Sequence, residues 1–105
     1  MADELVTSLD RDADTVTVAL HGEVDVANVD QVRIALTDAI AGQARSIVVD
    51  LSDLSFIDST GLGALVFGFQ RCRDQGIAFR LARPTRGVRQ ILVLSGLLEV
   101  VELQD

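Results

Sequence analysis

The chain has 105 residues, of which 49% are apolar, and a formal net charge of −7. This length predicts one domain over residues 1–105, and so apolar a chain is expected to fold rather than stay disordered. Its single cysteine and single histidine exclude an intrachain disulfide and a metal site built mainly from Cys or His. The longest apolar run, residues 61–69, is much shorter than the ~20 residues of a membrane helix.

Charge is distributed unevenly along the chain. Residues 1–58 carry 12 acidic residues and 3 arginines, whereas residues 59–105 carry 4 acidic residues and 6 arginines. An acidic surface repels phosphate backbones, so we expect no direct binding to nucleic acid. The acidic start lacks the basic and apolar stretches of a signal peptide, which predicts a cytoplasmic protein with no membrane anchor. Four arginines are interpreted as balancing the acidic half: Arg80, Arg83, Arg86 and Arg89.

The apolar pattern predicts alternating strands and helices. In chain order these are a strand over residues 5–9, a strand over 15–21, a helix from 29 to a stop at 42, a strand over 46–51, a helix over 60–75, a strand over 77–81, a helix from 84 to a stop at 96, and a strand over 100–103. Pro84 is expected in the first turn of the third helix.

Local signals place these elements more closely. Residues 15–21 alternate apolar and polar side chains, which predicts a half-buried strand that forms a hairpin with the strand before it. Residues 46–51 are apolar on both faces, which favours a central strand. Asn28 is expected to cap the first helix, with Gln31 as its capping-box partner and Gly42 as a left-handed stop.

Strand–helix–strand repeats require parallel neighbours with right-handed crossovers, whereas the opening hairpin adds an antiparallel edge. The sequence therefore predicts an α/β fold, with one mixed β-sheet, an antiparallel N-terminal hairpin and helices packed against the sheet.

The most unusual stretch is residues 50–63, expected to be a loop that leads from the central strand into the second helix. Glycine in an exposed helix interior costs about 1 kcal/mol, so Gly61 and Gly63 suggest close approach by a backbone, a partner or a ligand. A phosphate on Ser59 would meet unpaired N–H groups and the positive end of the helix dipole. The alternative is purely structural, with Asp58 or Ser59 capping a helix whose glycines allow tight packing on the sheet.

Signals for catalysis are missing from the sequence. There is no lysine and hence no Gly-x-x-x-x-Gly-Lys phosphate loop. A serine hydrolase would need a base beside Ser59, but the one histidine, His21, is expected in a turn, and no Gly-x-Ser-x-Gly elbow is present. Cys72 is expected to be a small buried residue. We therefore predict no enzymatic activity, no catalytic residue, no cofactor and no metal.

Three segments together resemble a known family: residues 21–25 (His-Gly-Glu-Val-Asp), residues 48–63 and residues 95–97 (Ser-Gly-Leu). In this order they resemble the STAS domain, in its branch of bacterial anti-sigma factor antagonists. In that family an anti-sigma factor, itself a serine kinase, phosphorylates the serine after the signature aspartate. The resemblance therefore implies phosphorylation at Ser59, with Asp25 and Asp58 near it. Thr60 places a second hydroxyl beside Ser59, and only the family pattern selects between them.

The resemblance also implies a partner-switching role in transcription regulation and stress response. The unphosphorylated form would bind the anti-sigma factor serine kinase and release the sigma factor. Phosphorylation of Ser59 would end that binding, and a phosphatase acting on phospho-Ser59 would reset the protein. The predicted partner-binding residues are Glu23, Asp25, Asp58, Ser59, Thr60, Gly61 and Leu62.

Two other functions remain open. In one, the chain is a STAS-like regulatory subunit of a transport or stress-signalling complex in which Ser59 is not phosphorylated. In the other, the N-terminus of the second helix binds a small anion or a nucleotide.

Overall fold

The computed structural model describes residues 4–104, so residues 1–3 of the acidic start lie outside it. Its elements are β1 (Val6–Asp12), β2 (Thr15–Val24), α1 (Val29–Ala41), β3 (Ser46–Ile57), α2 (Ser59–Asp74), β4 (Ala78–Ala82), α3 (Arg86–Leu94), a 3₁₀ turn η1 (Leu97–Glu99) and β5 (Glu102–Gln104). The sheet order is β1-β2-β3-β4-β5, with β1 antiparallel to β2 and all other neighbours parallel. The predicted mixed α/β fold, its N-terminal hairpin and its central strand are confirmed.

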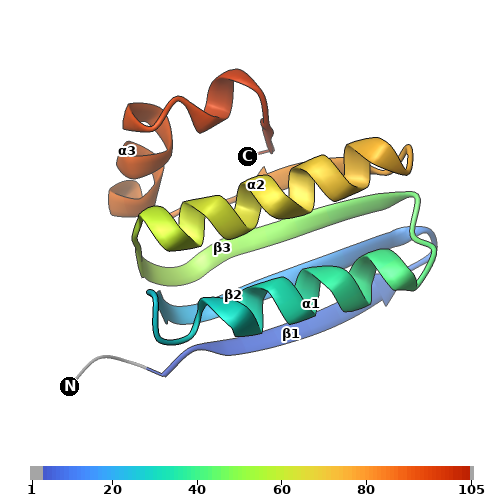
Figure 1. Cartoon of the computed structure of the whole chain (residues 1–105), viewed down its shortest axis with the longest axis horizontal. Helices are drawn as coiled ribbons and strands as arrows, with labels where there is room; N and C mark the ends of the chain where they lie inside the picture. Colours follow the sequence, from blue (N-terminus) through green and yellow to red (C-terminus); the bar gives the residue numbers. More distant parts are fainter. Residues whose placement is uncertain (1–3, 105) are drawn as a thin grey trace.

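One face of the sheet carries α1 and α2, which lie side by side along the strands (Figure 1). The alternating residues of β2 point Val16, Val18 and Leu20 into the core, as their period of two predicts. They meet buried aliphatic side chains of the helices such as Leu36 and Leu65. Each such side chain contributes about 1.5–3 kcal/mol through burial, so this helix–sheet layer is the main source of stability.

The strand β3 is twice as long as the predicted one, because residues 52–57 continue the strand instead of forming a loop. Its buried residues Leu51, Leu54 and Ile57 recur every third position, which hides the period of two expected for a strand. The pairing with β2 shifts register twice, between Ala19 and His21 and again between Gly22 and Glu23. Each shift inserts one extra residue into β3, as in a β-bulge, and keeps an apolar side chain facing the core.

Several predicted helix ends are wrong in detail. The Asn28 side chain makes no cap hydrogen bond to α1, and Gly42 is not left-handed, with φ −76°. A left-handed residue does follow one position later, because Gln43 has φ +60°. The third helix begins at Arg86 with Thr85 as its N-cap, so Pro84 precedes the helix. Gly96, with φ +79°, is left-handed and ends the α3 segment as expected.

The two glycines at the start of α2 serve different purposes. A Cβ atom on Gly61 would lie 2.5 Å from Cγ1 of Ile57 and 2.9 Å from Cγ1 of Val24, so glycine here lets the helix rest on the sheet. Gly63 is exposed, and a Cβ atom there would meet nothing within 4 Å. Packing therefore explains Gly61 and leaves Gly63 unexplained.

Alanine substitution should separate these two glycines. Gly61→Ala forces Ile57 and Val24 to move, which typically costs about 1–3 kcal/mol, partly offset by the better helix propensity of alanine. Gly63→Ala should instead stabilise the protein by up to about 1 kcal/mol. Urea unfolding of both variants tests this difference, and equal effects on the free energy of unfolding would contradict the packing.

Candidate functional site

The candidate site forms where β2 and β3 end at the same edge of the sheet. The parallel register pairs Val24 with Ile57, so Asp25 and Asp58 follow directly from paired positions. The backbone N–H of Asp58 donates to the carbonyl of Val24 at 3.3 Å. This register is why two aspartates 33 positions apart in the sequence lie at one edge, as the resemblance implied.

Asp58 is the N-cap of α2. Its Oδ1 accepts a hydrogen bond from the backbone N–H of Gly61 at 3.0 Å and another from the Thr60 hydroxyl at 2.5 Å. These bonds, the one from Thr60 foremost, lower the pKa of the Asp58 carboxyl below its ordinary value. Asp58 is therefore an anion at neutral pH and holds the first turn of the helix.

The two neighbouring hydroxyls of this turn are in different states. Thr60 is half-buried, and its hydroxyl donates to Asp58. Ser59 is the first residue of α2 and is exposed, and its hydroxyl makes no hydrogen bond with any of residues 4–104. Of these two hydroxyls, that of Ser59 is exposed and forms no hydrogen bond within residues 4–104.

The loop between β2 and α1 forms one side of the site and is held by Asn28. Its Oδ1 accepts from the backbone N–H of Asp25 at 3.0 Å, and its Nδ2 donates to the carbonyl of Glu23 at 2.9 Å. The carboxylate of Asp25 accepts from the N–H of Ala27 at 2.9 Å, and Val26 is 73% exposed. Sequence reasoning gave Asn28 a helix-capping role and missed this loop function, although an Asn three residues after Asp25 is a common turn signal.

The remaining predicted partner residues occupy less accessible positions. Gly61 is buried, so it acts through packing rather than through a surface contact. Leu62 is half-buried and packs against the core. Glu23 is half-buried within β2, opposite Phe56 of β3. The structure therefore brings Asp25, Asp58, Ser59 and Thr60 to one edge, with Glu23 just inside the strand.

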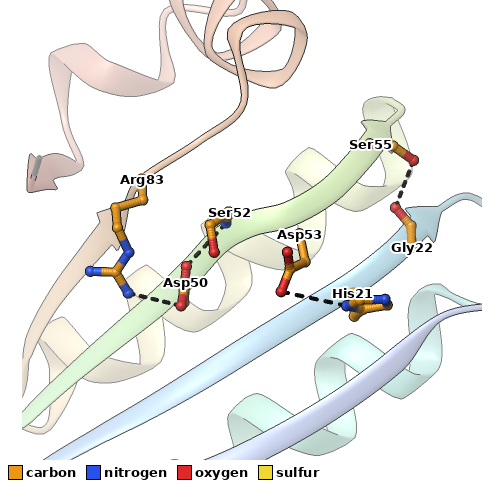
Figure 2. Close-up of polar contacts among 7 residues, drawn as sticks. All are labelled: His21, Gly22, Asp50, Ser52, Asp53, Ser55 and Arg83. Carbon is orange, nitrogen blue, oxygen red and sulfur yellow. Dashed lines mark hydrogen bonds and ion pairs between the residues drawn. The ribbon is translucent and has the colours of Figure 1, made fainter.

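Polar side chains of residues 50–55 form a second group, on β3 and its neighbours (Figure 2). Asp50 Oδ2 lies 2.8 Å from Nη2 of Arg83, and the Ser55 hydroxyl donates to the carbonyl of Gly22 at 3.0 Å. Burial opposes ionisation of Asp50, but the Arg83 hydrogen bond helps to bring its pKa below the ordinary value. His21 lies inside β2 rather than in a turn, with Nδ1 3.5 Å from Asp53 Oδ2. These contacts tie the bulged part of β3 to β2 and β4.

Three further features bear on the chemistry of residues 4–104: a thiol, the metal-ligating side chains and the length of the apolar helices. Cys72 is buried as expected, and burial raises the pKa of its thiol to about 11. Within residues 4–104, no three His, Cys, Asp or Glu side chains are placed to hold a metal ion. No helix in that range is long and apolar enough to cross a membrane.

Replacing Asp58 with alanine removes both cap bonds and should lower the free energy of unfolding by about 1 kcal/mol at neutral pH. Because folding lowers the pKa of Asp58, its carboxylate stabilises the fold above the ordinary carboxyl pKa. This contribution is lost as the pH falls through the lower folded value. Urea unfolding should therefore show a gap between wild type and Asp58→Ala that shrinks on acidification. Asp10→Ala, at an exposed carboxylate with no hydrogen-bond or ion-pair partner within residues 4–104, is the control and should change stability by less than about 0.5 kcal/mol. A gap independent of pH would contradict a charged cap.

Comparison with known proteins identifies the family that has this fold. A sequence model of the STAS domain matches residues 7–105. An anti-sigma F factor antagonist of Paenibacillus polymyxa is 32% identical over 89 residues, which cover 84% of this chain and 76% of the relative.

Solved structures agree with the sequence match. The anti-sigma factor antagonist SpoIIAA in its unphosphorylated form is 26% identical, with a TM-score of 0.80 over 95% of this chain and 89% of that one. SpoIIAA of Bacillus in the phosphorylated form is 25% identical, with a TM-score of 0.72 over 95% and 92% of the two chains. Because the family match spans nearly every residue and the fold agrees with it, the chain belongs to the STAS domain family.

Proposed function

We propose that this chain is an anti-sigma factor antagonist that switches partners through Ser59. Its unphosphorylated form binds an anti-sigma factor serine kinase and so releases a sigma factor. Phosphorylation of Ser59 ends that binding, and a phosphatase restores it. The protein would act in the cytoplasm as a binding module rather than an enzyme. The observation that carries the proposal is the free, exposed hydroxyl of Ser59 at the start of α2, directly after the capping carboxylate of Asp58.

The hydrogen bonds of the site favour Ser59 over Thr60 as the phosphate acceptor. Transfer to Thr60 would require its hydroxyl to leave Asp58, which would remove one of the two bonds that hold the cap. Transfer to Ser59 breaks no bond within residues 4–104. The geometry thus gives a physical reason for a choice that the family pattern alone supplied.

The start of α2 can carry a phosphate without unfolding. A phosphoserine adds about −1.5 to −2 charges at neutral pH, and the positive end of a helix dipole favours negative charge. Relatives with solved structures in an unphosphorylated and a phosphorylated form share the fold of this chain. The switch is therefore expected to act at the surface rather than through the core.

The surroundings of Ser59 make added charge effective. Asp25 and Asp58 already give this edge of the sheet negative charge. A partner surface that binds here must therefore be complementary to two carboxylates. Further negative charge on Ser59 adds repulsion and a desolvation cost to the interface. Since 1.4 kcal/mol changes affinity about tenfold, a modest penalty is enough to separate the partners.

Exposed Gly63 is consistent with a partner at this surface. Nothing within the described chain fills the space beside it, yet glycine there costs helix stability. A partner backbone that lies against the first turns of α2 would account for the missing side chain.

Affinity for the kinase should depend on charge at Ser59. Ser59→Ala adds no charge and cannot be phosphorylated at this position. It should therefore bind the kinase and stay bound when ATP is added. Ser59→Asp adds one negative charge, fewer than phosphate brings. It should therefore bind the kinase more weakly than the wild type does, but more tightly than the phosphorylated protein. Titration calorimetry with the cognate kinase at fixed ionic strength compares the two variants. Equal affinities for the alanine and aspartate variants would refute control by charge.

Stability measurements provide the control for this comparison. Ser59 is exposed and its hydroxyl makes no bond within residues 4–104, so both variants should unfold within about 0.5 kcal/mol of the wild type. Collapse of the fold in Ser59→Ala would show that Ser59 is primarily structural.

A further inference from the structure

We propose that the solvent-facing side of α3 is a second docking surface for the same partner protein. This α3 surface is defined by Arg86, Arg89, Gln90, Val93 and Leu94. We infer that it takes an acidic segment of the partner that also carries an apolar side chain. The inference rests on the proposed function, because it assigns a second contact to the kinase that docks at Ser59.

Most of the arginines in the C-terminal half already have internal partners. Arg71 lies over the ring of Phe67 at 5.2 Å, Arg73 over Phe69 at 5.8 Å, Arg80 lies 2.7 Å from Glu102 and Arg83 lies 2.8 Å from Asp50. Arg80 and Arg83 thus pair with acidic neighbours, as interpreted from the sequence, whereas Arg71 and Arg73 lie against aromatic rings. Arg86 differs, because it is exposed and forms no hydrogen bond or ion pair with any of residues 4–104.

The position of Arg86 is unfavourable for the isolated helix. It is the first residue of α3, at the positive end of the helix dipole, and the first turn has no acidic residue. A cation there is repelled by the helix dipole, and an acidic residue is the usual choice. An acidic side chain from a partner would convert this repulsion into attraction by both the arginine and the helix terminus.

The other end of the same helix face is apolar. Val93 is 59% exposed and Leu94 is 80% exposed, although both are large hydrophobic residues. Arg86, Gln90 and Val93 follow each other at helical spacing, so they form one stripe along α3. A shallow hollow on this stripe is lined by Arg86, Arg89, Gln90 and Val93. The surface is thus basic where the helix begins and apolar where it ends.

This surface lies next to the Ser59 site. The hydroxyl of Thr85, the N-cap of α3, donates to the carbonyl of Leu54 at 3.2 Å, four residues before Asp58 on the same segment. In the view of Figure 1, α3 lies at the same end of the molecule as the N-terminal end of α2. One partner can therefore span both surfaces. A negative edge at Asp25 and Asp58 beside a positive α3 would also fix the orientation in which the partner docks.

Charge reversal tests the basic half of the surface. The probe is the purified cognate anti-sigma kinase, titrated into full-length variants in a calorimeter at two ionic strengths. Arg86→Glu should weaken binding about tenfold, with a smaller loss at the higher ionic strength. Arg45→Glu is the matched control, because Arg45 is exposed and precedes β3 at the strand end opposite Asp58. It should change affinity less than about twofold.

An apolar pair of variants tests the other half. Leu94→Asp should also weaken binding about tenfold, whereas Ile34→Asp, at a 60% exposed position on α1, should not. Circular dichroism melts of all four variants check that each is folded. Equal affinities for Arg86→Glu and Arg45→Glu, or for Leu94→Asp and Ile34→Asp, would overturn the α3 surface.

The outcomes separate this inference from the proposed function. If charge at Ser59 still controls affinity while the α3 variants bind like their controls, the α3 surface is wrong and the switch stands. If the wild-type chain does not bind the kinase at all, both proposals are overturned.

Discussion

The rest of the site depends on the carboxylate of Asp58, which caps α2. It joins the end of β3 to the first turn of α2 by accepting from the N–H of Gly61 and the hydroxyl of Thr60. This cap fixes the start of α2. The helix can lie close to the sheet there because Gly61 has no side chain. The cap also engages Thr60 and leaves Ser59 exposed. A single N-cap thus links the packing of α2 to the difference between the bonded Thr60 hydroxyl and the exposed Ser59 hydroxyl.

The sheet positions this cap through irregularity as much as through regular pairing. Two register shifts between β2 and β3 keep Leu51, Leu54 and Ile57 in the core while the chain advances to the edge of the sheet. Without them the residue following Ile57 would not stand beside the end of β2 with this orientation. The contacts of Asp50 with Arg83 and of Ser55 with Gly22 hold the bulged stretch to its neighbours. These contacts fix the part of β3 that leads to Asp58 and Ser59.

Much of the fold could be predicted from the sequence because its signals are local. The alternation of residues 15–21 and the apolar run of 46–51 identify the hairpin and the central strand. The length of β3 could not be predicted, since bulges replace the period of two with a spacing of three. The roles of Asn28 and Thr60 were also missed. Their hydrogen bonds are local, but the sequence pattern gave Asn28 a helix-capping role and did not show which neighbouring hydroxyl bonds Asp58. Asp58 and Ser59 were singled out by the helix-start signal and again by the family resemblance, which added Asp25 as a neighbour of Ser59. The register explains why Asp25 and Asp58 share one edge.

The central claim is that the Thr60 hydroxyl is held by its hydrogen bond to Asp58, so that Ser59 alone accepts the phosphate. The most direct measurement is phosphopeptide mapping after incubation of the wild-type chain with its cognate anti-sigma kinase and ATP. The account predicts one phosphate per chain, on Ser59, and none when Ser59 is replaced by alanine. A phosphate on Thr60, Ser52 or Ser55, or continued phosphorylation of the Ser59→Ala variant, would contradict it.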